Sequence, residues 1–188
     1  MEDNRQYWFV AVVRPNNERS CCDRLENMFK VDGQKTIDFE TYLPLHKELH
    51  VWRNGRKKMI ERNLCPKYIF IRCTEPVRKS LKIQAPFINR FLINRSASPD
   101  EHGRYPFAYV PDDQMAILKI VAADPNIYAT IDPRKLEVGM KVRVIAGSLK
   151  DVEGYIYENP DGRTSLVIWI DSLGCAKIDI PLEYLEIV

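Results

Sequence analysis

The stretch VGMKVRVIAGSLKDVEGYIYE, residues 138–158, decides the fold of the C-terminal part of the chain. Two β-prone runs, KVRVI and GYIY, flank a turn that begins at Gly147 and ends at Gly154. Glycines continue to recur every seven to twelve residues and also separate the runs SLVIWI and AKIDI. Short β-prone runs with regular turn spacing are typical of a small antiparallel barrel. Residues 136–188 are therefore predicted to form a β-barrel domain.

The segment in front of this barrel has a different composition. DPNIYATIDPRK, residues 124–135, contains two Asp-Pro pairs and no helical period, so it is predicted to be a linker. Upstream of it, YWFVAVV at 7–13 and KYIFIRC at 67–73 are rich in aromatic and β-branched residues, which predicts buried strands. The chain thus divides into an N-terminal domain of residues 1–123, the linker and the barrel.

Helices are predicted between the strands of the N-terminal domain. Apolar residues at helical spacing indicate helices over about 17–29 and from Asp112 or Asp113 to about 123, and Pro76 opens a short one over 76–83. Interleaved strands and helices favour an α/β sandwich, an antiparallel sheet flanked by helices. With the barrel, the whole chain is assigned to the α+β class.

The stretch HVWRNGRKKMIERNLCPKYIFI, residues 50–71, predicts a β-hairpin. The Asn54-Gly55 pair is typical of a type I′ turn, in which both central residues have φ > 0. Four cations surround it: Arg53, Arg56, Lys57 and Lys58. Residues 50–95 carry 12 Lys/Arg and 2 Asp/Glu, a net charge of +10 in a chain whose other parts are acidic. Such a concentration indicates contact with a polyanion, and the alternative is a merely solvated surface.

Other function classes find little support. The sequence has no long apolar run for a membrane span and no signal-peptide pattern, so we expect a cytoplasmic protein without membrane contact. Five cysteines without a C-x-x-C pair argue against a disulfide framework and against zinc. His46 and His50 have the spacing of a helical metal pair, but Pro44 disfavours a helix there, and both are interpreted as hairpin surface residues. No phosphate-loop, nucleophile-elbow or dinucleotide motif occurs, so no enzyme, cofactor or metal is predicted.

Both halves of the chain resemble the NusG family of transcription elongation factors. Residues 138–158 look like a KOW motif, in which a G-x-x-x-D-x-x-G turn joins two strands of an SH3-like barrel. YWFVAV, YLPL and RNLCPKYIFI resemble strands of the family's N-terminal domain, the NGN domain. The resemblance extends to the specialised RfaH-like and UpxY-like antiterminators, and a general NusG is the rival within the family. For the UpxY group, the targets would be capsular polysaccharide operons.

The resemblance implies that the N-terminal domain binds the clamp helices of RNA polymerase, keeps the clamp closed and suppresses pausing and termination. The positions that match the family's polymerase-binding surface are Val12, Leu64, Cys65, Pro66 and Tyr68. The alternative is that Leu64 and Tyr68 only fill the local core. Cys65 replaces the Phe common in the family, which reduces the area available for burial. Lys79 and Ser80 occupy the place of a second polymerase contact without reproducing the usual His-Thr-Thr.

The same resemblance places the basic hairpin next to upstream DNA or the exposed non-template strand. The implied nucleic-acid contacts are Arg14, Arg53, Arg56, Lys57, Lys58 and Arg62. Phosphate contacts of this kind give salt-dependent affinity without sequence choice.

For the barrel, the resemblance implies a partner such as a small-subunit ribosomal protein or the termination factor Rho. Leu173 matches an apolar contact position, and the alternative is a turn-flanking residue packed on the barrel. Some RfaH proteins fold this domain as a helical hairpin, but LVIWI at 166–170 favours the barrel. The other function left open is a KOW-containing RNA-binding or ribosome-associated protein, which the net charge of −2 over residues 134–188 disfavours. Nothing indicates homo-oligomers, so a monomer is expected.

Overall fold

The computed structural model describes residues 4–31, 33–132 and 138–188. The chain gathers into two compact units, each built from two segments. Unit 1 comprises Met1–Leu43 and Cys65–Asp112, and unit 2 comprises Pro44–Leu64 and Asp113–Val188. The predicted hairpin and the last predicted helix are thus grouped with the C-terminal strands, and the predicted boundaries at 123 and 136 stay predictions.

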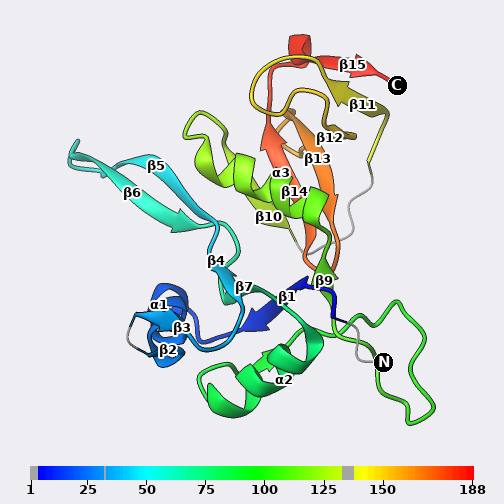
Figure 1. The fold of residues 1–188 in the computed structure, drawn as a ribbon. Helices are drawn as coiled ribbons and strands as arrows, with labels where there is room; N and C mark the ends of the chain where they lie inside the picture. The colour runs from blue at the N-terminus through cyan, green and yellow to red at the C-terminus, as the bar shows by residue number, and fades with distance from the viewer. Residues whose placement is uncertain (1–3, 32, 133–137) are drawn as a thin grey trace. The chain divides into compact units, whose positions relative to one another are not determined.

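Unit 1 is built on an antiparallel sheet with the strand order β4-β7-β1-β8, and β9 also pairs with β1 (Figure 1). Its strands are β1 (Tyr7–Val12), β4 (Glu40–Tyr42), β7 (Tyr68–Cys73), β8 (Arg90–Phe91) and β9 (Tyr109–Val110). A separate pair, β2 (Lys30–Val31) and β3 (Gln34–Lys35), follows the first helix. The two long central strands carry the apolar runs that the sequence marks as buried.

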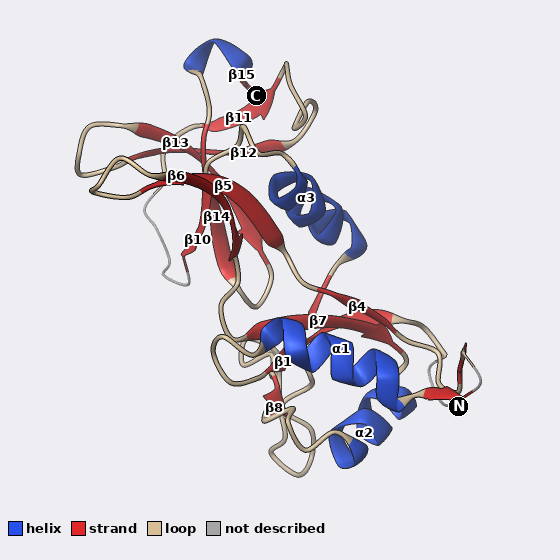
Figure 2. Ribbon diagram, turned by 90° about the vertical axis from the view of Figure 1, so that its left-hand side faces the viewer, coloured by secondary structure: helices blue, strands red, loops and turns tan. Residues whose placement is uncertain are grey.

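Both helices of unit 1 lie on the same side of this sheet (Figure 2). Helix α1 (Glu18–Met28) buries Cys21 and Leu25, and α2 (Glu75–Gln84) buries Leu81, in one cluster with Phe9 and Ile71 of the sheet. We call this side the first face. The predicted helices over 17–29 and 76–83 are confirmed within one or two residues. Met28, by contrast, is exposed although its spacing predicts an inward position.

Unit 2 contains a hairpin, a helix and a six-stranded antiparallel sheet. The sheet has the order β10-β14-β13-β12-β11-β15. The α-helix of the unit is α3 (Asp112–Ala123), whose first residue is the last residue of unit 1. A short 3-10 helix, η1 (Leu182–Tyr184), precedes the last strand. The strands of the sheet are β10 (Ala129–Asp132), β11 (Lys141–Val144), β12 (Glu153–Glu158), β13 (Thr164–Ile170), β14 (Gly174–Asp179) and β15 (Leu185–Ile187). The four runs predicted as strands are all strands, and residues 166–170 lie in β13. Strand β10 lies inside the predicted linker, of which residues 133–135 fall outside the described residues.

The turn at 147–154 has the geometry that its glycines suggest. Gly147 has φ 81, and Asp151 has φ 70 although it is not a glycine. Gly154 lies on β12 opposite Val142, and a Cβ there would approach the Leu166 side chain and the Val167 carbonyl oxygen to 2.7 Å. Gly154 is therefore required by the close approach of β13, not by its own backbone angles.

The hairpin of unit 2 consists of β5 (Leu45–Val51) and β6 (Lys57–Asn63). Its turn is not the predicted type I′. The Gly55 N–H donates to the Trp52 carbonyl at 2.9 Å, the Trp52 N–H donates to the Arg56 carbonyl at 2.9 Å, and Gly55 alone has a positive φ, 78°. This is a three-residue loop closed by a left-handed glycine, which Asn-Gly also allows because only its second residue must be left-handed.

Candidate protein and nucleic-acid interfaces

A tight turn joins the end of the hairpin region to β7. The Tyr68 N–H donates to the Cys65 carbonyl at 3.1 Å, with Pro66 and Lys67 between them. Lys67 has φ 74, so the turn has the form of type II, with proline at its second position and a left-handed residue at its third. Glycine is the usual residue at that third position, and a lysine there is strained.

A buried carboxylate holds this turn in place. Glu18, at the start of α1, is buried, and its Oε1 accepts the Lys67 N–H at 2.7 Å. The Lys67 carbonyl in turn accepts the Val13 N–H at 2.8 Å. The strained residue is therefore fixed to both α1 and the end of β1. Sequence reasoning missed Glu18, because an acid in the first turn of a helix is already explained by the helix dipole.

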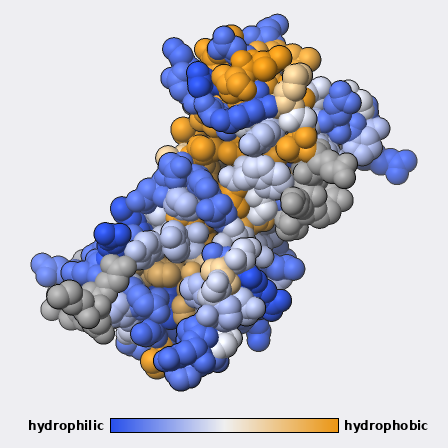
Figure 3. Space-filling model, turned by 90° about the vertical axis from the view of Figure 1, so that its right-hand side faces the viewer, coloured by the Kyte–Doolittle hydropathy of each residue, from blue (hydrophilic) through white to orange (hydrophobic). Residues whose placement is uncertain are grey.

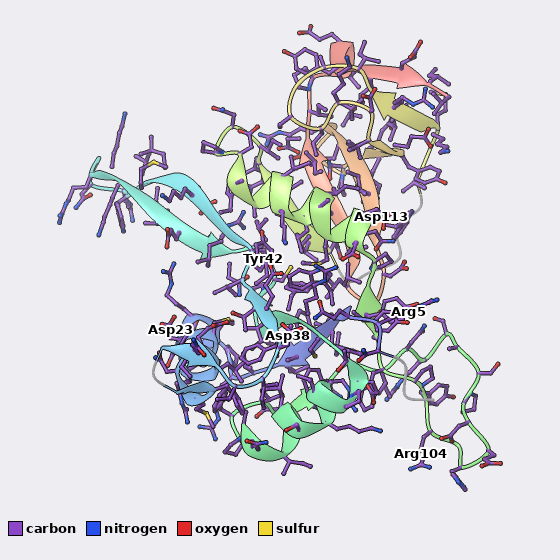
Figure 4. The ribbon with its side chains drawn as sticks, in the orientation of Figure 1. Arg5, Asp23, Asp38, Tyr42, Arg104 and Asp113 are labelled. Atoms are coloured by element: carbon purple, nitrogen blue, oxygen red, sulfur yellow. The ribbon has the colours of Figure 1, made fainter. Side chains whose placement is uncertain are left out.

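Tyr68 belongs to the second face of the unit 1 sheet, opposite to α1 and α2. The β1–β7 register places Val12 across from Tyr68, Val10 across from Phe70 and Trp8 across from Arg72. Tyr42 joins the same face from β4 (Figure 4), with its ring centre 6.4 Å from that of Trp8 and 6.3 Å from that of Phe70. Burial, together with the nearby Cys65 thiol, raises the pKa of Tyr42 to about 12.

The five predicted polymerase-binding residues differ in accessibility. Leu64 is 4% exposed and Cys65 is 1% exposed, and burial raises the pKa of the Cys65 thiol to about 12. Pro66 is exposed, whereas Val12 and Tyr68 are half-buried. The structure thus brings Val12 and Tyr68 together on one face and presents Pro66 beside them on the turn.

Lys79 and Ser80, the predicted second contact, lie on α2. Lys79 is exposed, and the Ser80 hydroxyl oxygen accepts a hydrogen bond from Gln84 Nε2 at 2.7 Å. Because α2 packs on the first face, these residues and Tyr68 belong to opposite sides of the sheet.

The predicted nucleic-acid contacts separate into three places. Arg53, Arg56, Lys57 and Lys58 are exposed around the hairpin tip. Arg62 lies lower on the hairpin, where its Nε is 3.2 Å from Glu48 Oε2 and its Nη2 donates to the Ala129 carbonyl at 3.1 Å. Arg62 is therefore engaged within unit 2, while the four tip cations face solvent.

Arg14 lines a hollow of about 340 Å³ on unit 1, between the end of β1 and α1. The Arg24 guanidinium lies 4.2 Å from the centre of the Phe87 ring in the same hollow, and Asn17 and Asn89 add polar groups. Arg24 and Phe87 were not predicted, since only the fold brings them next to Arg14.

Leu173, the predicted contact of the barrel, is buried in the turn between β13 and β14. Exposed apolar side chains at and next to β11, η1 and β15 include Met140, Ile145, Leu182 and Ile187. The view in Figure 3 shows apolar surface gathered over this unit. His46 is also buried, which contradicts its interpretation as a surface residue, while His50 is exposed.

Over the described part of the chain, no group of histidine, cysteine and acidic residues could hold a metal ion. None of the helices among these residues is long and apolar enough to cross a membrane. All five cysteines are free thiols.

The family model described as "Transcription termination factor nusG" matches residues 6–117. The chain belongs to the NusG family. This stretch runs from β1 into the first half of α3 and so contains the 65–68 turn, the hairpin and α2. It confirms the family that the sequence resembles.

Solved structures with a similar fold include NusG of Thermotoga maritima, from work on "Domain interaction in Thermotoga maritima NusG". It is 18% identical, with a TM-score of 0.56 over 97% of each chain. The MjSpt4:Spt5 complex in conformation A is 11% identical, with a TM-score of 0.31 over 96% of this chain and 97% of that chain. No curated protein matches the sequence.

Proposed function

We propose that this NusG-family protein is a transcription elongation and antitermination factor that binds the clamp of RNA polymerase and suppresses pausing and termination without catalysis of its own. The observation that supports this proposal most directly is the 65–68 turn. Glu18 fixes this turn at the end of the second face of the unit 1 sheet, which bears Val12 and Tyr68. An aromatic ring on a rigid support is a good anchor for a protein interface, because little conformational freedom is lost on binding. Leu64 and Cys65 are buried, so they would join the interface only where binding of the polymerase exposes them.

The domain organisation that we propose is an NGN domain of residues 1–123, a linker of 124–135 and a KOW barrel of 136–188. The six-stranded sheet and the Gly147–Gly154 turn support the barrel. In this arrangement the barrel recruits a small-subunit ribosomal protein or Rho. Its exposed apolar side chains around β11 and β15 support a recruiting surface, which Leu173 would join only by leaving its buried position.

The basic hairpin tip is proposed to contact upstream or non-template DNA. Its four cations form no ion pair among the described residues, so their charge is free to attract phosphates. Arg14, with Arg24 beside it, supplies a second basic position, and Lys79 with Ser80 supplies a polar contact on α2. The presence of Cys65 where the family commonly has Phe supports a specialised RfaH-like or UpxY-like role, with capsular polysaccharide operons as targets.

The test is binding of the full chain to reconstituted elongation complexes over a salt series. Tyr68→Ala is expected to abolish binding, whereas Tyr105→Ala, which removes an exposed tyrosine elsewhere on unit 1, leaves it unchanged. An Arg56/Lys57/Lys58→Ala triple is expected to flatten the salt dependence, because each lost phosphate contact lowers the slope by roughly 0.7 to 0.9. Binding to free RNA without binding to polymerase would instead favour a ribosome-associated or RNA-binding role.

A further inference from the structure

The two faces of the hairpin differ in chemistry. The β5–β6 register places Leu49 across from Met59 and Val51 across from Lys57 on one face. On the other face His50 lies across from Lys58. Closer to the loop, the hydrogen bond from the Trp52 N–H to the Arg56 carbonyl places Trp52 and Arg56 opposite each other. We call this second set, His50, Trp52, Arg56 and Lys58, the aromatic-basic face. Alternating residues point to opposite sides of a strand, so both aromatic rings lie on the face opposite to Leu49, Val51 and Met59. Lys57 is on that apolar side, whereas Arg56 and Lys58 are on the side of the rings.

The aromatic rings of this face are close together and accessible. The ring centres of His50 and Trp52 are 4.4 Å apart at an interplanar angle of 76°, and Trp52 is 41% exposed. Both backbone groups of Trp52 are bonded within the loop, its N–H to Arg56 and its carbonyl to Gly55. The indole is therefore held on a closed turn, and less freedom is lost when something packs on it.

Charge on this part of the hairpin is of one sign. Residues 50–58, HVWRNGRKK, contain four Lys/Arg and no acid. The nearest acid on the same face, Glu48, is paired with Arg62, at 3.2 Å. Positive charge next to an accessible indole is complementary to a ligand that combines negative charge with flat aromatic groups.

We propose that the aromatic-basic face is a stacking site for an unpaired nucleic-acid strand. One base stacks on the Trp52 indole while Arg56 and Lys58 contact the flanking phosphates. A duplex fits this face less well, because its bases are stacked on each other and present only their edges in the grooves. This inference rests on the proposed function, which directs the hairpin tip to nucleic acid, and it adds that the recognised form is single-stranded and is held by a base.

The experiment measures binding of the full chain to labelled oligothymidine and oligouridine of about 12 nucleotides, within the usual length range of single-strand sites, and to a duplex of equal length. Trp52→Leu is expected to weaken single-strand binding by about 5- to 150-fold at fixed salt, since stacking of one base contributes on that order. The salt slope is expected to stay unchanged. Arg56→Gln with Lys58→Gln is expected to lower the slope by about 1.4, because each phosphate contact on a single strand contributes about 0.7.

The matched control is Leu49→Ala, which removes an apolar side chain, 56% exposed, from the opposite face. It is expected to leave single-strand affinity unchanged, and Trp52→Phe is expected to keep most of it. The DNA and RNA arms distinguish the two sources of a single strand. Quenching of tryptophan fluorescence on binding is expected in the wild type and should decrease in Trp52→Leu.

Three results would overturn the stacking site. One is equal loss of single-strand and duplex binding in Trp52→Leu, and another is an unchanged single-strand affinity in that variant. The third is tighter binding to anionic lipid vesicles than to either oligonucleotide, which would assign Trp52 and the cations to a membrane surface. If Trp52→Leu is neutral while Tyr68→Ala still abolishes binding to elongation complexes, only the stacking site fails. If Tyr68→Ala leaves binding to elongation complexes unchanged, the proposed function fails, and the stacking site does not fail with it.

Discussion

The guanidinium carbon of Arg78 lies 3.4 Å from the centre of the Phe107 ring. Glu75, three residues earlier on α2, holds the same group through Nε at 2.6 Å and Nη2 at 2.8 Å. Arg78 is buried, and its charge is balanced by the Glu75 carboxylate and by the faces of the rings around it. The arrangement ties α2 to the segment before β9, and so supports the sheet that carries the 65–68 turn.

Glu75→Gln is expected to lower the free energy of unfolding by about 1.5 to 3 kcal/mol, because the buried guanidinium loses its charged acceptor. Urea unfolding of the full chain measures this change. The control is Glu101→Gln, whose side chain is 87% exposed and should change little. A loss below about 0.5 kcal/mol would mean that ring contacts alone hold Arg78.

Lys67→Gly is expected to raise the free energy of unfolding by about 0.5 to 1 kcal/mol. Glycine removes the cost of about 1 to 2 kcal/mol of a left-handed lysine, and the added freedom of the unfolded chain offsets part of this gain. Lys67→Ala keeps the positive φ and serves as the matched variant, expected to be close to neutral. Equal effects of glycine and alanine would contradict the turn geometry.

Glu18→Ala is expected to cost about 1 to 3 kcal/mol, since the Lys67 N–H loses its acceptor in a part-buried place. If Glu18 positions the turn, this variant also weakens binding to elongation complexes, and Glu18→Gln, whose amide oxygen can accept the same bond, restores most of both. Asp23→Ala on the exposed side of α1 is the control. Lost stability with full polymerase affinity would show that Glu18 has only a structural role.

Gly154→Ala is expected to destabilise the six-stranded sheet by at least about 1 to 3 kcal/mol, the usual cost of overpacking, because the Val167 carbonyl oxygen cannot retreat without breaking strand pairing. Gly139→Ala, with its nearest contact at 3.4 Å, is the matched control. Hydrogen exchange of β12 and β13 amides reports the local effect. Similar exchange rates in both variants would argue against the close approach at Gly154.

Acid titration is expected to reveal the Glu153 ion pairs on the sheet of unit 2. Hydrogen bonds from Lys141 and Arg143 lower the pKa of Glu153 to about 2. A lowered pKa gives stability that is present above the ordinary value near 4.5 and is lost as the pH falls toward 2. Carboxyl NMR of Glu153 should show its midpoint near 2, and a midpoint near 4.5 would mean that the ion pairs do not persist in solution.

Most regular elements could be predicted from the sequence because their signals are local. The run YWFVAVV, the spacing of Cys21 and Leu25, and the glycine-punctuated runs after residue 139 each specify an element without reference to the rest of the chain. Strand β10, by contrast, is a short segment between two Asp-Pro pairs and becomes a strand only through pairing with β14. Such a partner-dependent strand gives no periodic signal.

The candidate sites were predicted less completely, since accessibility depends on the folded chain. The sequence marks Leu64 and Cys65 as apolar positions but cannot tell that both are buried, while Pro66 next to them is exposed. The same holds for Arg62, which resembles the tip cations in sequence yet is paired with Glu48. The stacking of Arg24 on Phe87 joins residues more than 60 positions apart, for which no motif exists.

The alternation along the hairpin restricts how its length can vary among related chains. Adding or removing one residue in a single strand before the loop would exchange the positions of Trp52 and its apolar neighbours, because a one-residue slip turns every side chain to the other side. Changes by two residues in both strands preserve the aromatic-basic face and alter only the reach of the tip, by about 7 Å at 3.3 to 3.4 Å per residue. Relatives that keep this face should therefore have hairpins that differ from this one in steps of four residues in total.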